Sequence, residues 1–360
     1  MITSPIVVVL MAGGSGERLY QAHLSGKKKP KQFQNIISEN FSLIQEGFQY
    51  VRSITRRDLM FASTTEEWDN LIREELPEIK SENIIVEPCK RDTMAAVAFI
   101  AKEIHKKIPN AIVVTVPSDH VLKNVFDFTQ AVHAACETVE KYPQKIGLLG
   151  IKPDEPNTML GYVKIGKKLG IFNGQDVFTA DSFKEKPDKA TAVEYQNSDQ
   201  YYWNGGHFIF RAQTIIDLVR KYEPHLNDVL ERLTNCDNKE ERAEIFGSVR
   251  KDSFSTAIME VISADQRFVV PADLDWSDVG TWNSLWAHCP QDKNGNVCRG
   301  NVSTIESNNN LIFSNNGIKV ITLGINGLRV FVKKDMVLIV DHKSADDIKK
   351  VIHFCEEIED

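Results

Sequence analysis

Short apolar runs alternate with segments of helical periodicity over roughly the first 290 residues. Runs that predict strands lie at 6–10, 59–62, 84–86, 111–116 and 145–151, and those at 6–10 and 111–116 are typical of buried strands. Apolar residues recur at helical spacing at 41–52, 66–76 and 94–106, and a long charge-rich helical region follows at 214–249. This alternation predicts a doubly wound α/β domain with a mainly parallel sheet.

Polar motifs directly follow three of these strands. They are GGSGER at 13–18, EPCKRDT at 87–93 and PSDH at 117–120. Ligands of such sheets bind beyond the carboxyl ends of the strands, so we expect the three motifs to converge on one crevice. Later motifs are GYVKIG at 161–166, FKEKPD at 183–188, YYWNGGHFIF at 201–210 and DLDWSDVGTW at 273–282.

The pattern changes after about residue 290. Asn and Gly become dense, and short β-branched runs lie between them, which is typical of short strands with tight turns. Because their spacing is irregular, we predict a small all-β appendage and infer no repeat solenoid. Residues 344–357 are predicted to form a helix. The predicted domains are therefore 1–287, which is α/β, and 288–360, which is β-rich and ends in a helix.

The first strand enters a turn of small residues, Ala12 to Gly16, followed by Arg18 and by lysines at 27, 28, 29 and 31. A turn with few side chains lets backbone N–H groups approach a phosphate, and the neighbouring cations suit a polyphosphate. The spacing matches neither the Walker A loop nor the Rossmann fingerprint. The alternative interpretation is a glycine-rich turn beside a solvated basic loop.

Bulk composition narrows the class of protein. The chain has 360 residues, 42% of them hydrophobic, and a net charge of −7, which argues against nucleic-acid binding. No apolar run is long enough for a transmembrane helix, so no membrane partner is expected. The N-terminal apolar run is interpreted as a strand and not as a signal peptide. The six cysteines are widely spaced, without C-x-x-C pairs or zinc-site spacing, which predicts reduced thiols in a cytoplasmic protein.

AGGSGERL at 12–19 and KPKQF at 29–33 resemble the signature of the sugar-1-phosphate nucleotidyltransferases, specifically the mannose-1-phosphate guanylyltransferases. The resemblance covers roughly residues 6–340 and implies a Rossmann-like catalytic domain. It also implies a reaction in which GTP and mannose 1-phosphate give GDP-mannose and pyrophosphate. Tyr20 and Gln21 stand where the family usually has a Trp-Pro pair.

The resemblance assigns roles to residues at the matching positions. Arg18 and Lys31 are expected to meet the triphosphate, and Lys186 in FKEKPD to meet the sugar phosphate. The alternative interpretation of Lys186 is a surface lysine at a strand end. The residues expected to bind the nucleotide are Ala12, Gly13, Gly14, Gly16, Glu87, Arg91 and Thr93. Asp92 departs from the usual Asn of the family motif.

Sugar-binding residues follow from the same resemblance. They are Gly161, Tyr162, Glu185, Asn204 and Gly205. Gly205 stands at the usual serine position, and His207, in place of a common methionine, is interpreted as a core histidine. Ser255 and Thr256 replace a usual Asp-Tyr pair, and no catalytic role is assigned at 253–260.

Two aspartates are candidate metal ligands. Nucleotidyl transfer usually uses Mg²⁺, which is a hard cation that takes few oxygen ligands from protein. Asp119 in PSDH and Asp278 in WSDVGTW match the metal-binding aspartates of the family; from composition alone each is an ordinary loop aspartate. A pair of carboxylates also suits glycoside hydrolysis, but the basic loop has no use in that reaction.

Alternatives remain within and outside this family. The substrate could be a heptose or glucose phosphate, or another base, or the chain could be a catalytically idle sugar-nucleotide binder or regulator. Intact Arg18, Lys31, Asp119, Lys186 and Asp278 argue against the idle binder. GTP and a sugar 1-phosphate are the expected partners, and a homodimer is left open. Larger members of the family carry a cupin-type isomerase domain, for which this chain is too short, so a single activity is expected.

Overall fold

The structure is a computed structural model that describes residues 2–14, 29–315, 317–334 and 336–347. Its contacts divide into two compact units, each described by itself. The N-terminal unit comprises Met1–Gly14, Gly47–Ser118 and Leu122–Trp276. The C-terminal unit comprises Ser15–Glu46, Asp119–Val121 and Ser277–Asp360. The domain boundary between residues 287 and 288 stays a prediction. The compact units do not test it, because they group residues by their contacts and place 15–46 and 119–121 with the C-terminal part.

A nine-stranded sheet forms the centre of the N-terminal unit, in the order β3-β2-β1-β4-β9-β6-β10-β8-β7. Its strands are β1 (Ile6–Met11), β2 (Met60–Thr65), β3 (Ile84–Glu87), β4 (Ile112–Pro117), β6 (Ile146–Ile151), β7 (Gly161–Phe172), β8 (Gln175–Lys184), β9 (Tyr201–Arg211) and β10 (Arg267–Ala272). The short strands β5 (Val121–Leu122) and β11 (Trp276–Ser277) contain residues at which the chain passes between the units.

The predicted parallel sheet is confirmed in its first half. β1 pairs in parallel with both β2 and β4, with Val8 opposite Met60 on one side and Val114 on the other. β9 runs antiparallel between β4 and β6, and β8 runs antiparallel to β10. The sheet is therefore mixed but mainly parallel. The antiparallel strands carry the later motifs, so pairing with their neighbours decides where those motifs lie.

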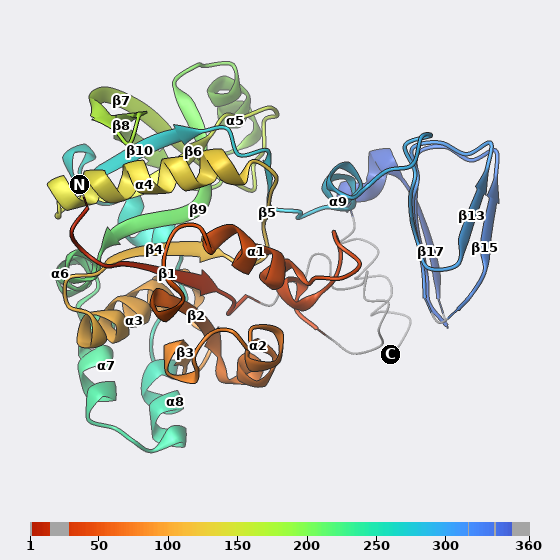
Figure 1. Ribbon diagram of the computed structural model, residues 1–360. Helices are drawn as coiled ribbons and strands as arrows, with labels where there is room; N and C mark the ends of the chain where they lie inside the picture. Colours follow the sequence, from red (N-terminus) through yellow and green to blue (C-terminus); the bar gives the residue numbers. More distant parts are fainter. Residues whose placement is uncertain (1, 15–28, 316, 335, 348–360) are drawn as a thin grey trace. The chain divides into compact units, whose positions relative to one another are not determined.

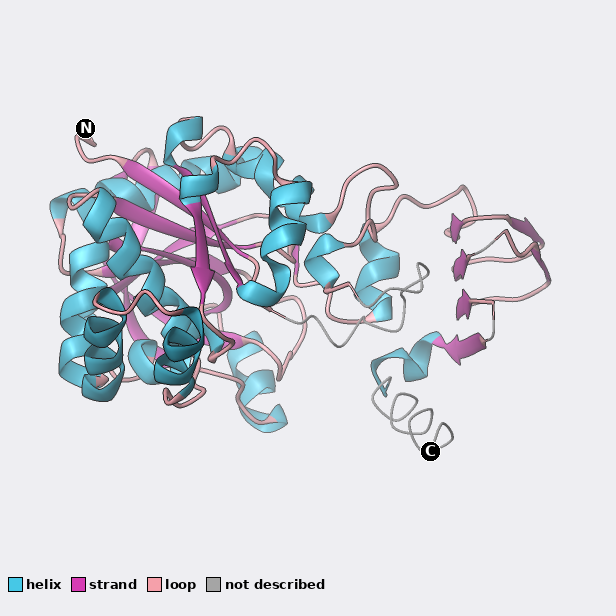
Figure 2. Ribbon diagram, turned by 90° about the horizontal axis from the view of Figure 1, so that it is seen from below, coloured by secondary structure: helices cyan, strands magenta, loops and turns pink. Residues whose placement is uncertain are grey.

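Helices cover both faces of this sheet (Figures 1 and 2). The longest, α4 (Val125–Lys141), packs on β6, β9 and β10, and α3 (Asp92–Lys107) and α6 (Ala212–Tyr222) pack together on the other face. The α4 helix was not predicted as a separate element; Asn124 begins it by accepting a hydrogen bond from the Asp127 N–H. The other α-helices are α1 (Leu43–Val51), α2 (Asp69–Glu75), α5 (Lys189–Gln196), α7 (Pro224–Thr234) and α8 (Lys239–Gly247).

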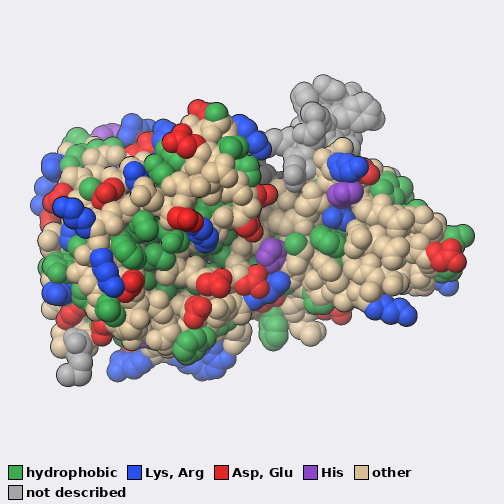
Figure 3. Space-filling model, turned by 90° about the horizontal axis from the view of Figure 1, so that it is seen from above, with side chains coloured by type: hydrophobic (Ala, Val, Ile, Leu, Met, Phe, Trp, Pro, Cys, Tyr) green, Lys and Arg blue, Asp and Glu red, His purple; other side chains and the backbone are tan. Residues whose placement is uncertain are grey.

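Several one-turn elements complete the described secondary structure. The 3₁₀ turns are Lys31–Phe33, Arg57–Leu59, Glu66–Trp68, Ser81–Asn83, Ala264–Gln266 and His342–Asp347, and a π-helix spans Ser255–Met259. No helix of the described residues is both long and apolar enough to cross a membrane. On the face seen in Figure 3, basic and acidic side chains are interspersed.

The C-terminal unit is built from parallel coils of chain after α9 (Trp282–His288). Its strands are β12 (Val297–Arg299), β13 (Val302–Ile305), β14 (Leu311–Ser314), β15 (Val320–Leu323), β16 (Leu328–Val332) and β17 (Val337–Asp341). β14 pairs in parallel with β16, and β13 pairs in parallel with β15, both with Cα partners 18 residues apart. The antiparallel strand β17 ends the stack beside β16.

This repeat corrects the sequence analysis, which inferred no solenoid. The first step, from β12 to β14, is 14 residues, which makes the spacing look irregular in the sequence. Asparagines join the coils: Asn310 contacts Asn296, and Asn308 contacts Asn326. The helix predicted at 344–357 is a 3₁₀ turn over its first described residues, and the rest lies outside the described residues.

Candidate active site

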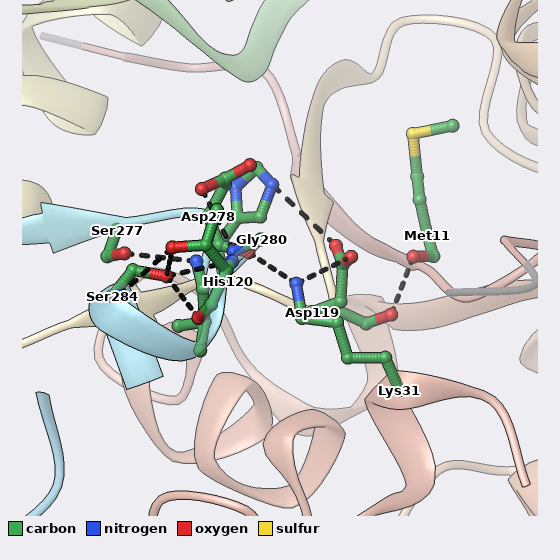
Figure 4. Close-up of polar contacts among 11 residues, drawn as sticks. Met11, Lys31, Asp119, His120, Ser277, Asp278, Gly280 and Ser284 are labelled. Carbon is green, nitrogen blue, oxygen red and sulfur yellow. Dashed lines mark hydrogen bonds and ion pairs between the residues drawn. The ribbon is translucent and has the colours of Figure 1, made fainter. Parts of the chain in front are cut away.

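Lys31 joins two predicted metal aspartates in the C-terminal unit (Figure 4). Its 3₁₀ turn follows Pro30, and the residue is only 5% exposed. The ammonium Nζ lies 3.1 Å from Asp119 Oδ2 and also donates to the backbone carbonyl of Asp278. The structure thus brings together three residues that the sequence analysis singled out in three separate motifs.

The turn that carries Asp278 is strained and well bonded. Val279 is fully buried and has a φ of 42°, which is rare for a β-branched residue. Ser277 Oγ accepts from the Val279 N–H at 3.0 Å, and Asp278 Oδ1 accepts from the Gly280 N–H at 3.1 Å. Backbone strain of this kind persists only where surrounding contacts enforce it, and it clusters at functional sites.

His120 is a neighbour of this cluster that the sequence analysis did not single out. Its Nε2 lies 3.6 Å from Asp119 Oδ1, whereas Lys31 contacts the other oxygen of the same carboxylate. The signal was available, because His120 is the last residue of PSDH. The Asp119 side chain is 36% exposed.

In the N-terminal unit, the glycine-rich turn lies against Glu87. The Ala12 N–H donates to the Ser63 carbonyl at 2.7 Å, which continues the β1–β2 pairing into the turn. A Cβ at Gly13 would lie 3.6 Å from Glu87 Oε1, whereas a Cβ at Gly14 would meet no described atom within 4 Å. The predicted residues Gly16 and Arg18 lie outside the described residues.

Glu87 is an acid buried at the end of β3. It is 4% exposed, and its carboxyl accepts a hydrogen bond from the Ser63 hydroxyl at 3.2 Å. Burial raises the pKa of Glu87 to about 8, and the hydrogen bond from Ser63 opposes only part of that rise. Near neutral pH the carboxyl is therefore protonated in much of the protein, and a ligand that donates hydrogen bonds would favour the ionised form.

Arg91 and Thr93 contact protein backbone. Arg91 Nε donates to the Gly247 carbonyl at 2.9 Å, and Thr93 Oγ1 accepts from the Phe254 N–H at 3.0 Å. Between them, Asp92 has a φ of 66° and accepts from the Thr93 N–H. Asn and Asp are the non-glycine residues that adopt this conformation most readily, so Asp92 keeps the backbone geometry available to the usual Asn.

Strand register brings the predicted sugar motifs together. Gly161 lies opposite Asn204 across β7 and β9, and Tyr162 lies opposite Lys184 across β7 and β8. A Cβ at Gly161 would lie 2.6 Å from Glu185 Oε2, so a larger residue there would displace that carboxylate. Tyr162 is buried, and its hydroxyl donates to the Asn157 carbonyl.

Lys186 and Gly205 complete this group in different ways. Lys186 Nζ pairs with Glu185 Oε1 at 3.1 Å, and the lysine side chain is half exposed. A Cβ at Gly205 would lie 2.7 Å from Ile151 Cδ1 and 3.0 Å from His207 Nδ1. Packing against these two side chains therefore accounts for the glycine at the usual serine position in this chain. His207 is fully buried, in agreement with its interpretation as a core histidine.

A segment that the sequence analysis left without a role contacts several of these motifs. Phe254 donates to Thr93, Ser255 lies 3.4 Å from Asn204 Nδ2, and Glu260 accepts from the backbone N–H of Glu185. No sequence signal identified it, because the usual Asp-Tyr pair is absent at 255–256.

The sequence model described as Nucleotidyl transferase matches residues 7–295. The chain belongs to the nucleotidyl transferase family. The match includes the glycine-rich turn, Lys31, the two aspartates and the sugar motifs. Proteins of the nucleotidyl transferase family generally use a divalent metal, and their substrates are a nucleotide and, in this group, a sugar phosphate.

Curated relatives within the nucleotidyl transferase family are similar over almost the whole chain. Mannose-1-phosphate guanylyltransferase 2 of Escherichia coli O157:H7 is 31% identical over 98% of this chain and 74% of its own length. Mannose-1-phosphate guanylyltransferase of Escherichia coli K12 is 33% identical, with the same two shares. A crystal structure from Thermus thermophilus, named as a mannose-1-phosphate geranyltransferase, is 28% identical with a TM-score of 0.83. That likeness covers 98% of this chain and 99% of the solved one.

Proposed function

We propose that the protein transfers a guanylyl group from GTP to mannose 1-phosphate, giving GDP-mannose and pyrophosphate. The observation that carries the proposal is the contact of Lys31 with Asp119 and with the Asp278 backbone. A buried cation held by one carboxylate and one backbone carbonyl suits a reaction that gathers negative charge on phosphate oxygens. The guanine and mannose assignments are supported by the names of the curated relatives.

The chemistry is an in-line displacement at the α-phosphorus of GTP. A phosphate oxygen of the sugar 1-phosphate forms the new P–O bond, the bond to the β-phosphate oxygen breaks, and pyrophosphate leaves. Catalysis of this kind consists mostly of positioning and charge neutralisation. In the proposal, Lys31 and Arg18 meet the triphosphate, and Lys186 holds the phosphate of the sugar.

Asp119 and Asp278 are proposed as the ligands of Mg²⁺. The described residues contain no group of three or more His, Cys, Asp or Glu side chains suited to a metal. Two carboxylates nevertheless fit Mg²⁺, which is commonly bound by one or two carboxylates together with waters and substrate phosphates. When bound, the ion would neutralise charge on the triphosphate.

The nucleotide side of the proposed site combines the glycine turn with Glu87. Backbone groups of Ala12, Gly13, Gly14 and Gly16 would approach the phosphates. The ionised carboxylate of Glu87 is suited to the N1–H and amino donors of guanine, and the other common nucleobases lack this pair of neighbouring donors. We assign Arg91 and Thr93 to the framework of this part of the site, because both side chains contact backbone of the protein.

The sugar side comprises Gly161, Tyr162, Glu185, Asn204 and Gly205. Glu185 Oε2 is buried and has no hydrogen-bond partner in the described residues, which suits it as an acceptor for a sugar hydroxyl. An unpaired buried acceptor costs free energy, so a partner supplied by the substrate contributes to binding. Gly161 keeps the space beside that carboxylate open.

Pyrophosphate release tests the proposal directly. GTP, ATP, UTP and dTTP are each combined with mannose, glucose and heptose 1-phosphates in the presence of Mg²⁺. Release confined to GTP and mannose 1-phosphate supports the proposed reaction with its base and sugar. Release with another pair keeps the mechanism and changes the substrate, and absence of release with every pair favours a catalytically idle binder.

A further inference from the structure

One segment of the N-terminal unit contacts three predicted binding motifs. It runs from Asp252 to Glu260 and includes the π-helix Ser255–Met259. Its first part bonds to the start of α3: the Asp252 carbonyl accepts from Met94, and Phe254 donates to Thr93. Its last residue, Glu260, accepts a hydrogen bond from the turn that follows β8. π-helices are rare and frequently lie at functional sites.

The contact at the end of the segment is the strongest of the set. Glu260 Oε1 accepts from the backbone N–H of Glu185 at 2.8 Å and lies 3.6 Å from Lys184 Nζ. A hydrogen bond from a backbone N–H to a carboxylate is stronger than one between neutral groups. Glu260 therefore binds the main chain directly before the residue that carries the phosphate-binding role, Lys186.

The backbone at Lys186 needs such support. Its φ is 44°, a conformation that lysine rarely adopts, and its N–H donates to the Leu160 carbonyl at 3.2 Å. Two hydrogen bonds thus hold consecutive residues of the turn, one accepted by Leu160 and one by Glu260. If the second is lost, the turn can relax to an ordinary negative φ, which would redirect the Lys186 side chain.

We propose that Glu260 is a positioning residue for the sugar phosphate: its carboxylate fixes the turn of Glu185 and Lys186 in the conformation that binds the substrate. This inference rests on the proposed function. It gives a role to a residue in the stretch to which the sequence analysis assigned none. It also predicts an effect on one substrate only, because the Glu260 contacts are to the sugar motif.

The variants separate the hydrogen bond from charge and from packing. Glu260→Ala and Glu260→Met both remove the acceptor, and Met retains most of the side-chain volume. Glu260→Gln keeps a carbonyl acceptor for the Glu185 N–H. Lys184→Ala removes only the exposed ion pair, which contributes little to stability, and serves as the matched control.

The measurement is steady-state pyrophosphate release, with KM determined separately for the sugar 1-phosphate and for GTP. We expect Glu260→Met and Glu260→Ala to raise the KM for the sugar phosphate by about tenfold or more, the equivalent of about 1.4 kcal/mol. The KM for GTP should change by less than about twofold, and Glu260→Gln and Lys184→Ala should stay within about threefold of wild type. Circular dichroism verifies folding, and Glu260→Met decides the question if Glu260→Ala does not fold.

Two kinds of failure are distinguishable. Wild-type protein that releases no pyrophosphate with any substrate pair overturns the proposed function and this inference with it. Active wild type together with an unchanged sugar-phosphate KM in a folded Glu260→Met variant overturns the inference alone. An equal rise in both KM values, or a loss in Glu260→Gln as large as in Glu260→Met, also overturns it.

Discussion

Lys31 Nζ and Asp119 Oδ2 lie 3.1 Å apart, although the two residues are 88 positions apart in the chain. The lysine is almost fully buried, and its other contact is the Asp278 backbone carbonyl. A buried ammonium without compensation is costly, so these acceptors hold the cation in one place. In the proposed function, this arrangement provides a fixed positive charge for the triphosphate, next to the proposed carboxylate ligands of the metal.

The first prediction concerns Lys31. Lys31→Ala should lower kcat for pyrophosphate release by about 10²-fold or more, because a preorganised cation would be lost from the developing charge. Lys123→Ala is the control, since that lysine is exposed and its nearest acidic partner lies 3.9 Å away. Near-normal turnover by folded Lys31→Ala protein would contradict the assigned role.

The second prediction separates two functions of Asp278. Asp278→Asn keeps an oxygen that can accept from the Gly280 N–H but removes the charge that a metal requires. We expect it to fold like wild type and to lose turnover by about 10²-fold or more, partly restored at high Mg²⁺. Circular dichroism and a Mg²⁺ titration of activity are the measurements. Full activity at ordinary Mg²⁺ concentrations would exclude the carboxylate as a metal ligand.

Removal of the metal is the third prediction. Treatment with EDTA should abolish pyrophosphate release, and added Mg²⁺ should restore it, because charge on the triphosphate would otherwise remain uncompensated. Mn²⁺ and Ca²⁺ in parallel test how strictly the site selects its ion. Activity that persists in metal-free buffer would remove Mg²⁺ from the proposal.

The fourth prediction follows from the raised pKa of Glu87, about 8 in the folded protein. From roughly pH 4.5 to pH 8 the folded protein holds a proton that the unfolded chain releases, so the contribution of this group to the free energy of unfolding falls as pH rises. Glu87→Gln cannot titrate, so it removes this fall in the free energy of unfolding. Its melting temperature relative to wild type should therefore increase between about pH 5 and pH 8.5.

The control for this pH experiment is Glu82→Gln, whose side chain is 72% exposed. The difference in melting temperature between this variant and wild type should not follow pH in the same way. A pH-independent difference for Glu87→Gln would mean that the carboxyl has an ordinary pKa. In wild type, the KM for GTP should also fall as pH rises, since guanine would bind the ionised carboxylate.

The fifth prediction concerns the asparagines between the coils of the C-terminal unit. Asn310 is fully buried; its side chain donates to Asn296 and Ile325 and accepts from the Leu328 N–H. Asn310→Ala leaves these groups unpaired and should cost about 2 kcal/mol or more of stability. Thermal unfolding measures the loss, with the exposed Asn301→Ala as control. Equal melting temperatures for the two variants would contradict the role of this contact.

The local pattern of apolar and polar residues was sufficient to predict most elements of the N-terminal sheet. The β-branched run at 6–10 and the glycine turn after it predict a buried strand followed by a turn, because the signals for both lie within a few neighbouring residues. The strand at 111–116 and the helix at 94–106 were predicted within a few residues of their observed bounds. The polar residues at strand ends were identified because they directly follow predicted strands, and parallel strands place such residues at one edge of the sheet.

Long-range pairing determined what the sequence could not reveal. The 18-residue spacing of the coils is shown by the pairing of β13 with β15 and of β14 with β16. The first step, from β12 to β14, is shorter, so the sequence alone does not show a regular period. The glycine at 205 is explained by the neighbouring Ile151 side chain, more than fifty positions away. Neither feature follows from the residues next to it in the chain.

The sequence by itself therefore determined the fold class, the order of the motifs and the residue types that suit phosphate and metal. Only the tertiary structure decided which acceptors hold Lys31, that Glu87 is buried, and that Glu260 accepts from the backbone directly before Lys186. The physical reason is that burial and hydrogen bonding depend on neighbours in space. Those neighbours are set by packing between segments that are remote in the chain.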